Sequence, residues 1–310
     1  MDESERRARL GLSCATDGGE PAVADLVARV GAEEAWQLLR RGGLGEPLAE
    51  RAAAVSVDGV QRLAAAAGIR FVVPGDEEWS ERLEDLAHAD PIQRRGGVPL
   101  GLWLRGPGQL AALLRRSVAV VGSRAATAYG NGITTDLAAD LADRGVTVVS
   151  GGAFGIDAAA HRGALSVGGP TVGVLACGVD VAYPPANAEL FDEMARRHLL
   201  VSELPPGAHP TRVRFLARNR LIAALSSATV VVEAALRSGA RNTAGWALEC
   251  GRPLMAVPGS VYSRGSTGPH LMIRSGQAVL VTNAAEVLEL VSASGQDTIP
   301  LTSGPRRATD

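Results

Sequence analysis

The chain has 310 residues, of which 46% are apolar and 21% are charged. This composition is typical of a globular protein and excludes extensive disorder and a coiled coil. The length favours two domains, or one large domain with an appendage. The richest apolar stretch, residues 221–236, contains two serines and a glutamate, so we expect no membrane span. The mixed charges of residues 1–7 favour the absence of a signal peptide. Three widely spaced cysteines favour reduced thiols in the cytoplasm.

Charge is unevenly distributed along the chain. The net charge is −2, but residues 205–275 hold nine arginines and only two acidic residues. A basic segment in a nearly neutral chain is typical of a protein that binds a polyanion. The alternative is that these arginines lie on solvated faces and at the C-terminal ends of helices.

The first part of the chain is predicted to be helical. Between residues 20 and 67, apolar residues recur at helical spacing on both sides of a glycine turn at 42–45. Two helices joined by a glycine turn are typical of a small packing module, although they can also contact a nucleic-acid backbone. We expect a helical domain over residues 1–67.

From residue 68 the pattern changes to strands that alternate with helices. Short apolar runs predict strands at 69–73, 100–104, 117–121, 146–150, 171–175, 199–202, 229–232, 254–257 and 278–281. Helices are expected at 129–143, 156–167, 187–198, 218–226, 243–250, 269–274 and 284–291. This alternation indicates a second, α/β domain over residues 68–291, with βαβ units around a doubly wound, mostly parallel sheet. Residues 292–310 are rich in Ser, Thr, Gly and Pro and are expected to be disordered.

Two loops that follow predicted strands have the composition of anion sites. Ligands of an open α/β sheet bind beyond the carboxyl ends of its strands. The first loop, Gly122-Ser123-Arg124, predicts either a structural turn or an anion contact, and it lacks the G-x-G-x-x-G pattern of a dinucleotide site. The second loop, residues 150–157, has three glycines before a helix, so its backbone N–H groups are expected to cradle a phosphate.

Asp157 and His161 stand four residues apart on the helix that follows the glycine loop. One interpretation is an acid–base pair. The other is an aspartate that accepts backbone N–H groups in the first turn, followed by a packed histidine. We favour the second interpretation because no nucleophile or further base accompanies the two residues. No cysteine and histidine cluster has metal-ligand spacing, so neither a metal nor another cofactor is expected.

A third loop, residues 212–220, places four arginines around Phe215. The apolar residues at 221, 222 and 225 are expected to bury one face of the following helix and to leave its arginine-rich N-terminal turn exposed. Arginines that hold phosphates, beside an aromatic ring that stacks a base, are suited to gripping a single strand, because a duplex hides its base faces. The alternative is that Phe215 belongs to the core and the arginines to the surface.

Further motifs extend this pattern over residues 117–291. They are Val121-Gly122-Ser123-Arg124, Ser150-Gly151-Gly152-Ala153, Gly155-Ile156-Asp157, Ala160-His161, Tyr183-Pro184, Ser202-Glu203, Phe215, Arg218-Asn219-Arg220-Leu221-Ile222-Ala223, Val231-Val232-Glu233-Ala234, Ser238-Gly239-Ala240, Thr243-Ala244, Glu249, Gly251-Arg252 and Val257-Pro258-Gly259-Ser260. In order and spacing they resemble the DNA-processing protein A (DprA/Smf) family.

The resemblance implies an extended Rossmann-like domain preceded by a small helical domain of the sterile-alpha-motif type. It implies a homodimer without enzymatic turnover that binds single-stranded DNA, protects it and loads the recombinase RecA onto it in natural transformation and recombination. The resemblance and the three loops together give a set of candidate DNA-binding residues. These are Arg124, Gly151, Gly152, Gly155, Arg212, Phe215, Arg218, Asn219, Arg220, Ser238 and Gly239.

The sequence departs from the family at three points. Leu216 stands where Phe-Pro is usual, and His270 stands where asparagine is common. Many relatives add a C-terminal winged-helix-like domain, for which the residues after Val291 are too few.

Two other functions are consistent with a Rossmann-like fold. Nucleotide phosphoribohydrolases are enzymes that use a Pro-Gly-Gly-x-Gly-Thr loop, and the nearest stretch here, residues 258–262, lacks it. A nucleotide-sensing or scaffold protein that holds a small phosphate ligand is the third possibility. Fold kinship alone does not separate the three functions, so the site residues must.

Overall fold

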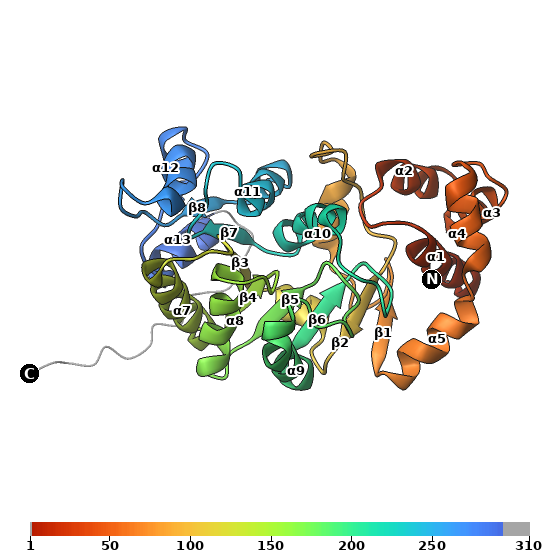
Figure 1. Cartoon of the computed structure of the whole chain (residues 1–310), viewed down its shortest axis with the longest axis horizontal. Helices are drawn as coiled ribbons and strands as arrows, with labels where there is room; N and C mark the ends of the chain where they lie inside the picture. The colour runs from red at the N-terminus through yellow and green to blue at the C-terminus, as the bar shows by residue number, and fades with distance from the viewer. Residues whose placement is uncertain (1, 294–310) are drawn as a thin grey trace, which may run out of the picture.

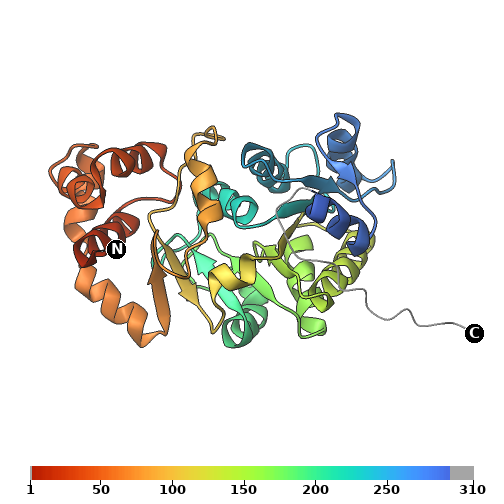
Figure 2. The same ribbon diagram turned by 180° about the vertical axis from the view of Figure 1, so that it is seen from behind.

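The computed structural model describes residues 2–293 and has its N-terminal helices at one end and its C-terminal elements at the other (Figures 1 and 2). Residues 294–310, on which most of the predicted disordered tail falls, lie outside the described residues. No helix within residues 2–293 is long and apolar enough to cross a bilayer.

Residues 3–66 fold into helices joined by short turns, in the region predicted to be helical. The helices are α1 (Glu3–Ala15), α2 (Pro21–Val30), α3 (Ala32–Arg40), α4 (Glu46–Ala54) and α5 (Val57–Ala66). Helix α1 is not predicted by the sequence, because its charged first turns hide the apolar positions that include buried Leu10 and Leu12. Leu12 packs among these helices, whereas Leu10 joins a cluster with Trp103 of the sheet. Helix α1 therefore packs against both parts of the chain.

The strands within residues 69–280 form one mostly parallel sheet, which confirms the predicted α/β class. They are β1 (Ile69–Val72), β2 (Leu102–Arg105), β3 (Ser117–Val121), β4 (Thr147–Ser150), β5 (Thr171–Val174), β6 (Leu199–Ser202), β7 (Ala228–Val231), β8 (Leu254–Ala256) and β9 (Val279–Leu280). Their order is β1-β2-β6-β5-β4-β3-β7-β8-β9. Strand β2 pairs antiparallel with both β1 and β6, and every other pair is parallel.

The strand order reverses between β3 and β7. From β3 the chain winds outward through β4, β5 and β6, then returns to pair β7 on the other side of β3. Such a reversal opens a crevice at the carboxyl ends of the two strands, where doubly wound sheets bind their ligands. The fold itself therefore places the candidate site beyond Val121 and Val231.

Helices cover both faces of the sheet. They are α6 (Leu110–Leu114), α7 (Ala128–Asp143), α8 (Ile156–Ser166), α9 (Ala188–Arg197), α10 (Arg212–Ala224), α11 (Gly239–Glu249), α12 (Thr267–Arg274) and α13 (Ala284–Ala293), with short 3-10 turns η1 (Glu81–Ala87), η2 (Pro185–Asn187) and η3 (Arg264–Ser266). Figure 1 shows α7, α8 and α9 on the lower side of the sheet and α10 and α11 on its upper side.

The core follows from the pleat of the strands. Val118 and Val120 pack with α7 and α8, while Ala119 and Val121 pack with α10 and α11. Because successive side chains point to opposite faces, a strand buried on both faces is apolar throughout. That is why residues 117–121 stand out as a continuous apolar run.

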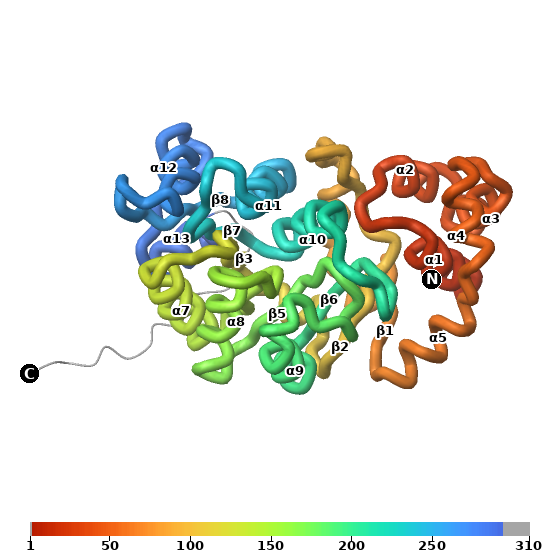
Figure 3. The backbone as a smooth tube through the Cα atoms, in the orientation of Figure 1, coloured from red at the N-terminus to blue at the C-terminus, as the bar shows by residue number. Residues whose placement is uncertain are grey.

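Helix α10 begins six residues earlier than predicted. The expected start at Arg218 is wrong because Thr211 caps the helix: its hydroxyl accepts the backbone N–H of Arg214 at 3.3 Å. A threonine before a helical stretch is a known start signal. The segment 212–217 is thus helical rather than a loop, and Figure 3 shows α10 between α11 and the N-terminal helices.

Candidate functional site

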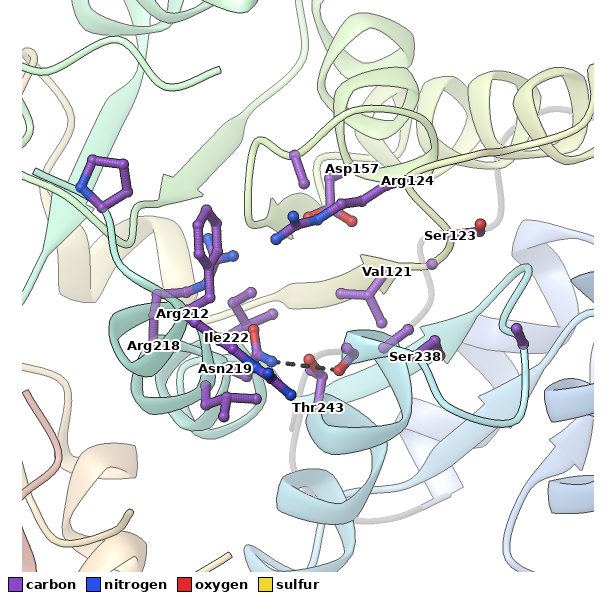
Figure 4. Close-up of a pocket in the computed structure, with 18 of the residues that line it drawn as sticks. Val121, Ser123, Arg124, Asp157, Arg212, Arg218, Asn219, Ile222, Ser238 and Thr243 are labelled. Carbon is purple, nitrogen blue, oxygen red and sulfur yellow. Dashed lines mark hydrogen bonds between the residues drawn. The ribbon is translucent and has the colours of Figure 1, made fainter. Parts of the chain in front are cut away.

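A cavity of about 660 Å³ occupies the crevice at the strand reversal (Figure 4). Its walls come from segments far apart in the chain. These are residues 121–125 after β3, Ala153 and Asp157 at α8, Tyr183, residues 210–222 at α10 and residues 235–243 at α11. Figure 4 shows Arg124 and Asp157 on one side, facing Arg212, Arg218 and Asn219 on the other.

Phe215 is the aromatic centre of the cavity. The Arg124 guanidinium carbon lies 4.5 Å from its ring centroid and that of Arg218 lies 5.7 Å away. The Tyr183 ring lies 5.8 Å away, tilted by 56°. Phe215 is half-buried on the first turns of α10 and lines the cavity, so the alternative that it belongs to the core does not hold.

Arg218 is a buried cation at the base of the cavity, contrary to the expected exposed turn. Only 5% of the residue is exposed, and its Nη1 donates to the carbonyl oxygens of Gly151, at 2.7 Å, and Val174. Burial lowers its pKa to about 10, and the nearby Asp157 carboxylate opposes that shift. At that pKa the guanidinium stays charged at neutral pH. Arg218 therefore supplies a fixed positive charge to the cavity.

The donors of the glycine loop point inward. The buried Asp157 carboxyl faces the backbone N–H groups of Gly122, Gly151 and Ala153, so a side chain of the protein itself occupies the predicted phosphate cradle. Burial raises the pKa of Asp157, while Arg218 and these three donors oppose the shift. The prediction that the glycine loop presents its N–H groups to a ligand is corrected by this contact. Gly151, Gly152 and Gly155 do not line the cavity.

The glycines are instead required by close packing. A Cβ on Gly151 would lie 2.5 Å from Nη1 of Arg218. Gly155 has φ +72, and a Cβ there would lie 2.3 Å from the carbonyl oxygen of Ser123. The loop is therefore a tight turn that makes room for the arginine and for the loop after β3.

Asp157 and His161 do not form an acid–base pair. The His161 ring is fully buried, and its Nδ1 lies 2.7 Å from the Thr171 hydroxyl. Because that hydroxyl donates to the Val148 carbonyl, it accepts the Nδ1–H of His161. Burial, followed by the charge of Arg218, lowers the pKa of His161 to about 3. The interpretation as a backbone-satisfying aspartate and a packed histidine is confirmed.

Arg220 does not reach the cavity. It is fully buried and faces Glu203, with Nη1–Oε2 and Nη2–Oε1 distances of 2.8 and 2.6 Å. Its Nε donates to the carbonyl of Gly97. The expectation that Arg220 is exposed in the first turn of a helix is wrong because the earlier start of α10 turns it toward the core. Its partners make it a structural residue.

Distant acids also account for part of the basic segment. Arg214 pairs with Asp17 at 2.9 Å and Arg252 with Asp85 at 2.5 Å, in addition to Arg220 with Glu203. Among the described residues, three exposed arginines at the cavity form no ion pair. They are Arg124, Arg212 and Arg237. The cavity thus gathers three arginines whose charge no acidic side chain within residues 2–293 neutralises.

The remaining predicted site residues lie on the α10–α11 side of the cavity. Asn219 donates to the side-chain oxygen of Asn242 at 3.1 Å, which ties the two helices together. Ser238 is the N-cap residue of α11; its hydroxyl is buried without a partner among the described residues, and Gly239 follows it. A helix N-terminus favours an anion. Residues 2–293 hold no group of three or more His, Cys, Asp or Glu side chains able to bind a metal.

Sequence reasoning missed two cavity residues, Arg237 and Tyr183. Arg237 belongs to the basic segment, but its sequence neighbours do not indicate a position at the cavity. Tyr183 lies in the loop after β5, and the carboxyl ends of parallel strands share one edge of the sheet. The position of the loop after β5 at that edge could have indicated that Tyr183 lies near the site. The residues around Tyr183 in the sequence do not indicate that its ring contacts Phe215.

The doubly wound sheet and its cavity define an extended Rossmann-like protein with an arginine-lined crevice at the strand reversal. Residues 70–292 match the family model of DNA recombination-mediator protein A, and the chain belongs to that family. A DNA processing protein DprA of Mycobacterium tuberculosis is 47% identical over 281 residues, which cover 88% of this chain and 72% of that protein. The DprA of Streptococcus pneumoniae is 44% identical over 181 residues, 58% of this chain and 64% of the relative.

Solved structures agree with this assignment. The crystal structure of DprA from Streptococcus pneumoniae covers 93% of this chain, and 98% of its own length is matched, with a TM-score of 0.74 and 32% identity. A structure of DNA processing protein A from Helicobacter pylori, reported for its single-stranded DNA binding mode, has a TM-score of 0.61 and 30% identity. The matched region covers 73% of this chain and 97% of the Helicobacter pylori chain.

Proposed function

We propose that this protein is a recombination mediator that binds single-stranded DNA in the cavity at the strand reversal. The observation that carries the proposal is the position of Phe215, half-buried and surrounded by the guanidinium groups of Arg124 and Arg218. An aromatic ring for a base and cations for phosphates are the two requirements of single-strand binding. The DNA-binding mode reported for the Helicobacter pylori relative supports the same conclusion.

A base must displace Arg124 to stack on the Phe215 face that this arginine covers. An exposed cation–π contact contributes roughly 0.5–1 kcal/mol, whereas a base on an aromatic ring contributes roughly 1–3 kcal/mol. The exchange is therefore favourable, and the exposed Arg124 side chain is then released to contact a phosphate. Arg212 and Arg237 lie at the same cavity for neighbouring phosphates. These contacts carry little base identity, so binding is largely independent of sequence.

The Ser238 hydroxyl and the first N–H groups of α11 form a second anion-binding element of the proposed site. Asn219 positions that helix through Asn242. Arg220 and the glycine loop support the cavity from behind without contacting DNA. The proposed DNA-binding surface is thus Arg124, Arg212, Phe215, Arg218, Ser238, Gly239 and Arg237.

Protection of the strand and loading of RecA are proposed because the chain belongs to the mediator family. The protein protects a single strand in the cytoplasm and loads RecA onto it during transformation or recombination, without catalytic turnover. The phosphoribohydrolase alternative is not favoured, because residues 258–262 do not line the cavity and Tyr262 is 96% exposed. The chain is proposed to divide into a helical domain, residues 1–67, and the Rossmann-like domain that follows.

The protein is also proposed to be a homodimer. Strand β9 is an edge of the sheet, and Val279 and Leu280 are 51% and 47% exposed. Leu271 on the neighbouring α12 is 40% exposed. An apolar edge strand is a template for pairing with another chain. Light scattering is expected to give a dimer mass that Leu280→Glu reduces to a monomer; a monomeric wild type refutes this part.

The direct test of DNA binding is fluorescence anisotropy with a labelled dT oligonucleotide and its duplex, each titrated across salt. We expect tighter binding of the single strand and a steep loss of affinity with salt. A nucleoside monophosphate added in excess is expected neither to compete nor to release free base. Absence of oligonucleotide binding at low salt, or hydrolysis of the monophosphate, contradicts the proposal. RecA loading is then measured as the rate of filament formation on the strand with and without this protein.

A further inference from the structure

Tyr183 forms part of the cavity wall beside Phe215. Its side chain is 42% exposed and lines the same cavity. Within residues 2–293 its hydroxyl has no hydrogen-bond partner, so neither that group nor close packing explains a tyrosine here. What the residue presents to the cavity is the flat surface of its ring.

The loop that carries Tyr183 is fixed at both ends. Before it, Gly178 donates its N–H to the carbonyl of Ala208 at 2.9 Å, and the Asp180 carboxylate accepts the N–H of Gly207. After it, the Asn187 side chain donates to the carbonyl of Gly152 at 3.1 Å. The loop after β5 is thereby attached to the loop after β6 and to the glycine loop. The Tyr183 backbone is held in place relative to Phe215.

The two rings cannot hold a base between them. Their centroids are 5.8 Å apart and their planes are inclined by 56°. A base inserted between two rings needs parallel planes roughly 7 Å apart, twice the ordinary contact distance between carbon atoms. Each ring therefore offers a separate surface. Bases that follow these two surfaces are inclined to each other and cannot stack on one another.

We propose that Tyr183 is a second base-stacking platform, and that Tyr183 and Phe215 bind two successive nucleotides with their bases unstacked from each other. This inference rests on the proposed single-strand binding. Its consequence is a preference for weakly stacking strands. Adenine runs must lose a strong base stack on entering the cavity, whereas thymine runs lose little, and preferences of this kind arise from stacking and backbone flexibility. The cavity thus selects strands by their stacking rather than by hydrogen bonds to bases.

The test compares the affinities of the full chain for dT and dA oligonucleotides of equal length, measured by anisotropy. The wild type is expected to bind the dT strand several-fold more tightly. Tyr183→Leu removes the flat ring from an exposed position and is expected to weaken dT binding roughly fivefold or more, the lower end of the contribution of one base stack. The ratio of the dT to the dA affinity falls toward one. Tyr183→Phe retains the ring and both affinities.

The matched control is Tyr262→Leu, which removes a 96% exposed tyrosine outside the cavity and is expected to change neither affinity. The inference is overturned if the wild type binds the dT and dA strands equally well. It is also overturned if the ratio of the dT to the dA affinity is the same for Tyr183→Leu as for the wild type. Neither result contradicts single-strand binding itself. Absence of single-strand binding by the wild type refutes the proposed function instead. Thermal unfolding of each variant establishes that it is folded.

Discussion

The Arg220 guanidinium and the Glu203 carboxylate face each other in the interior, joined by two hydrogen bonds of 2.8 and 2.6 Å. The pair connects α10 with the loop after β6. Glu203 also accepts the N–H of Gly19 at 3.4 Å, and Arg220 donates to the Gly97 carbonyl. One ion pair thus links the N-terminal helices, the sheet and the helix that carries the cavity residues.

Glu203→Gln is expected to lower the free energy of unfolding by about 3–5 kcal/mol, because it leaves the buried Arg220 charge unpaired. Urea unfolding at pH 7 measures the change. The control is Glu193→Gln, whose ion pair with Arg197 is exposed and contributes about 0–1 kcal/mol. Equal effects of the two substitutions would contradict the structural role of the pair.

Phe215→Leu is expected to weaken single-strand binding by about 1–3 kcal/mol, the contribution of one base–aromatic stack. The substitution retains an apolar side chain at a half-buried position, so the protein stays folded. Phe215→Tyr retains the ring and should bind like the wild type. Anisotropy with a dT oligonucleotide measures all three proteins, and an unchanged affinity of the leucine variant would exclude stacking on this ring.

Arg124→Ala and Arg212→Ala are each expected to weaken binding of all sequences and to reduce the salt slope by about 0.7, the value for one phosphate contact on a single strand. Arg218 is less suitable for this test, because its guanidinium also bonds the carbonyl of Gly151. Arg274→Ala is the control, an exposed arginine of the basic segment away from the cavity. If Arg124→Ala tightened binding at an unchanged slope, Arg124 would only cover Phe215.

Buried His161 is expected to make the protein sensitive to mild acid. Its pKa is about 3 in the folded protein and near 6.5 when unfolded, so the unfolded chain binds the proton first. The stability that this group contributes is complete above pH 6.5 and is lost as pH falls toward 3, by about 1.4 kcal/mol per pH unit. Burial lowers the pKa of His198 as well, in the same direction.

The measurement is urea unfolding at pH 7, 6 and 5, on the wild type and on His161→Leu. The variant no longer has this titrating group and is expected to lose less stability between pH 7 and 5. His198 is retained in both proteins, so its effect cancels in the comparison. Parallel pH dependences of the two proteins would mean that the pKa of His161 is the same in the folded and the unfolded protein.

Local features of the chain were sufficient to predict most elements of the sheet. Strand β3 and strand β6 begin and end where the apolar runs do, because a strand buried on both faces is apolar at every position. The helix expected at 284–291 is α13, and the side chain of Asn283 before it accepts the N–H of Glu286 at 3.1 Å. Helices α1 and α10 were missed or shortened because charged residues masked their periodicity.

The sequence by itself determined the fold class, the edge of the sheet where the cavity lies, and the residue types gathered there. Only the tertiary structure decided which of those residues face a ligand. Arg220 and Arg124 look alike in the sequence, but one meets Glu203 in the core and the other remains exposed beside Phe215. The N–H groups of the glycine loop likewise turn to Asp157. Hydrophobic periodicity is a property of neighbouring residues, whereas the partner of a charge or of a backbone donor is set by chain segments that meet only on folding.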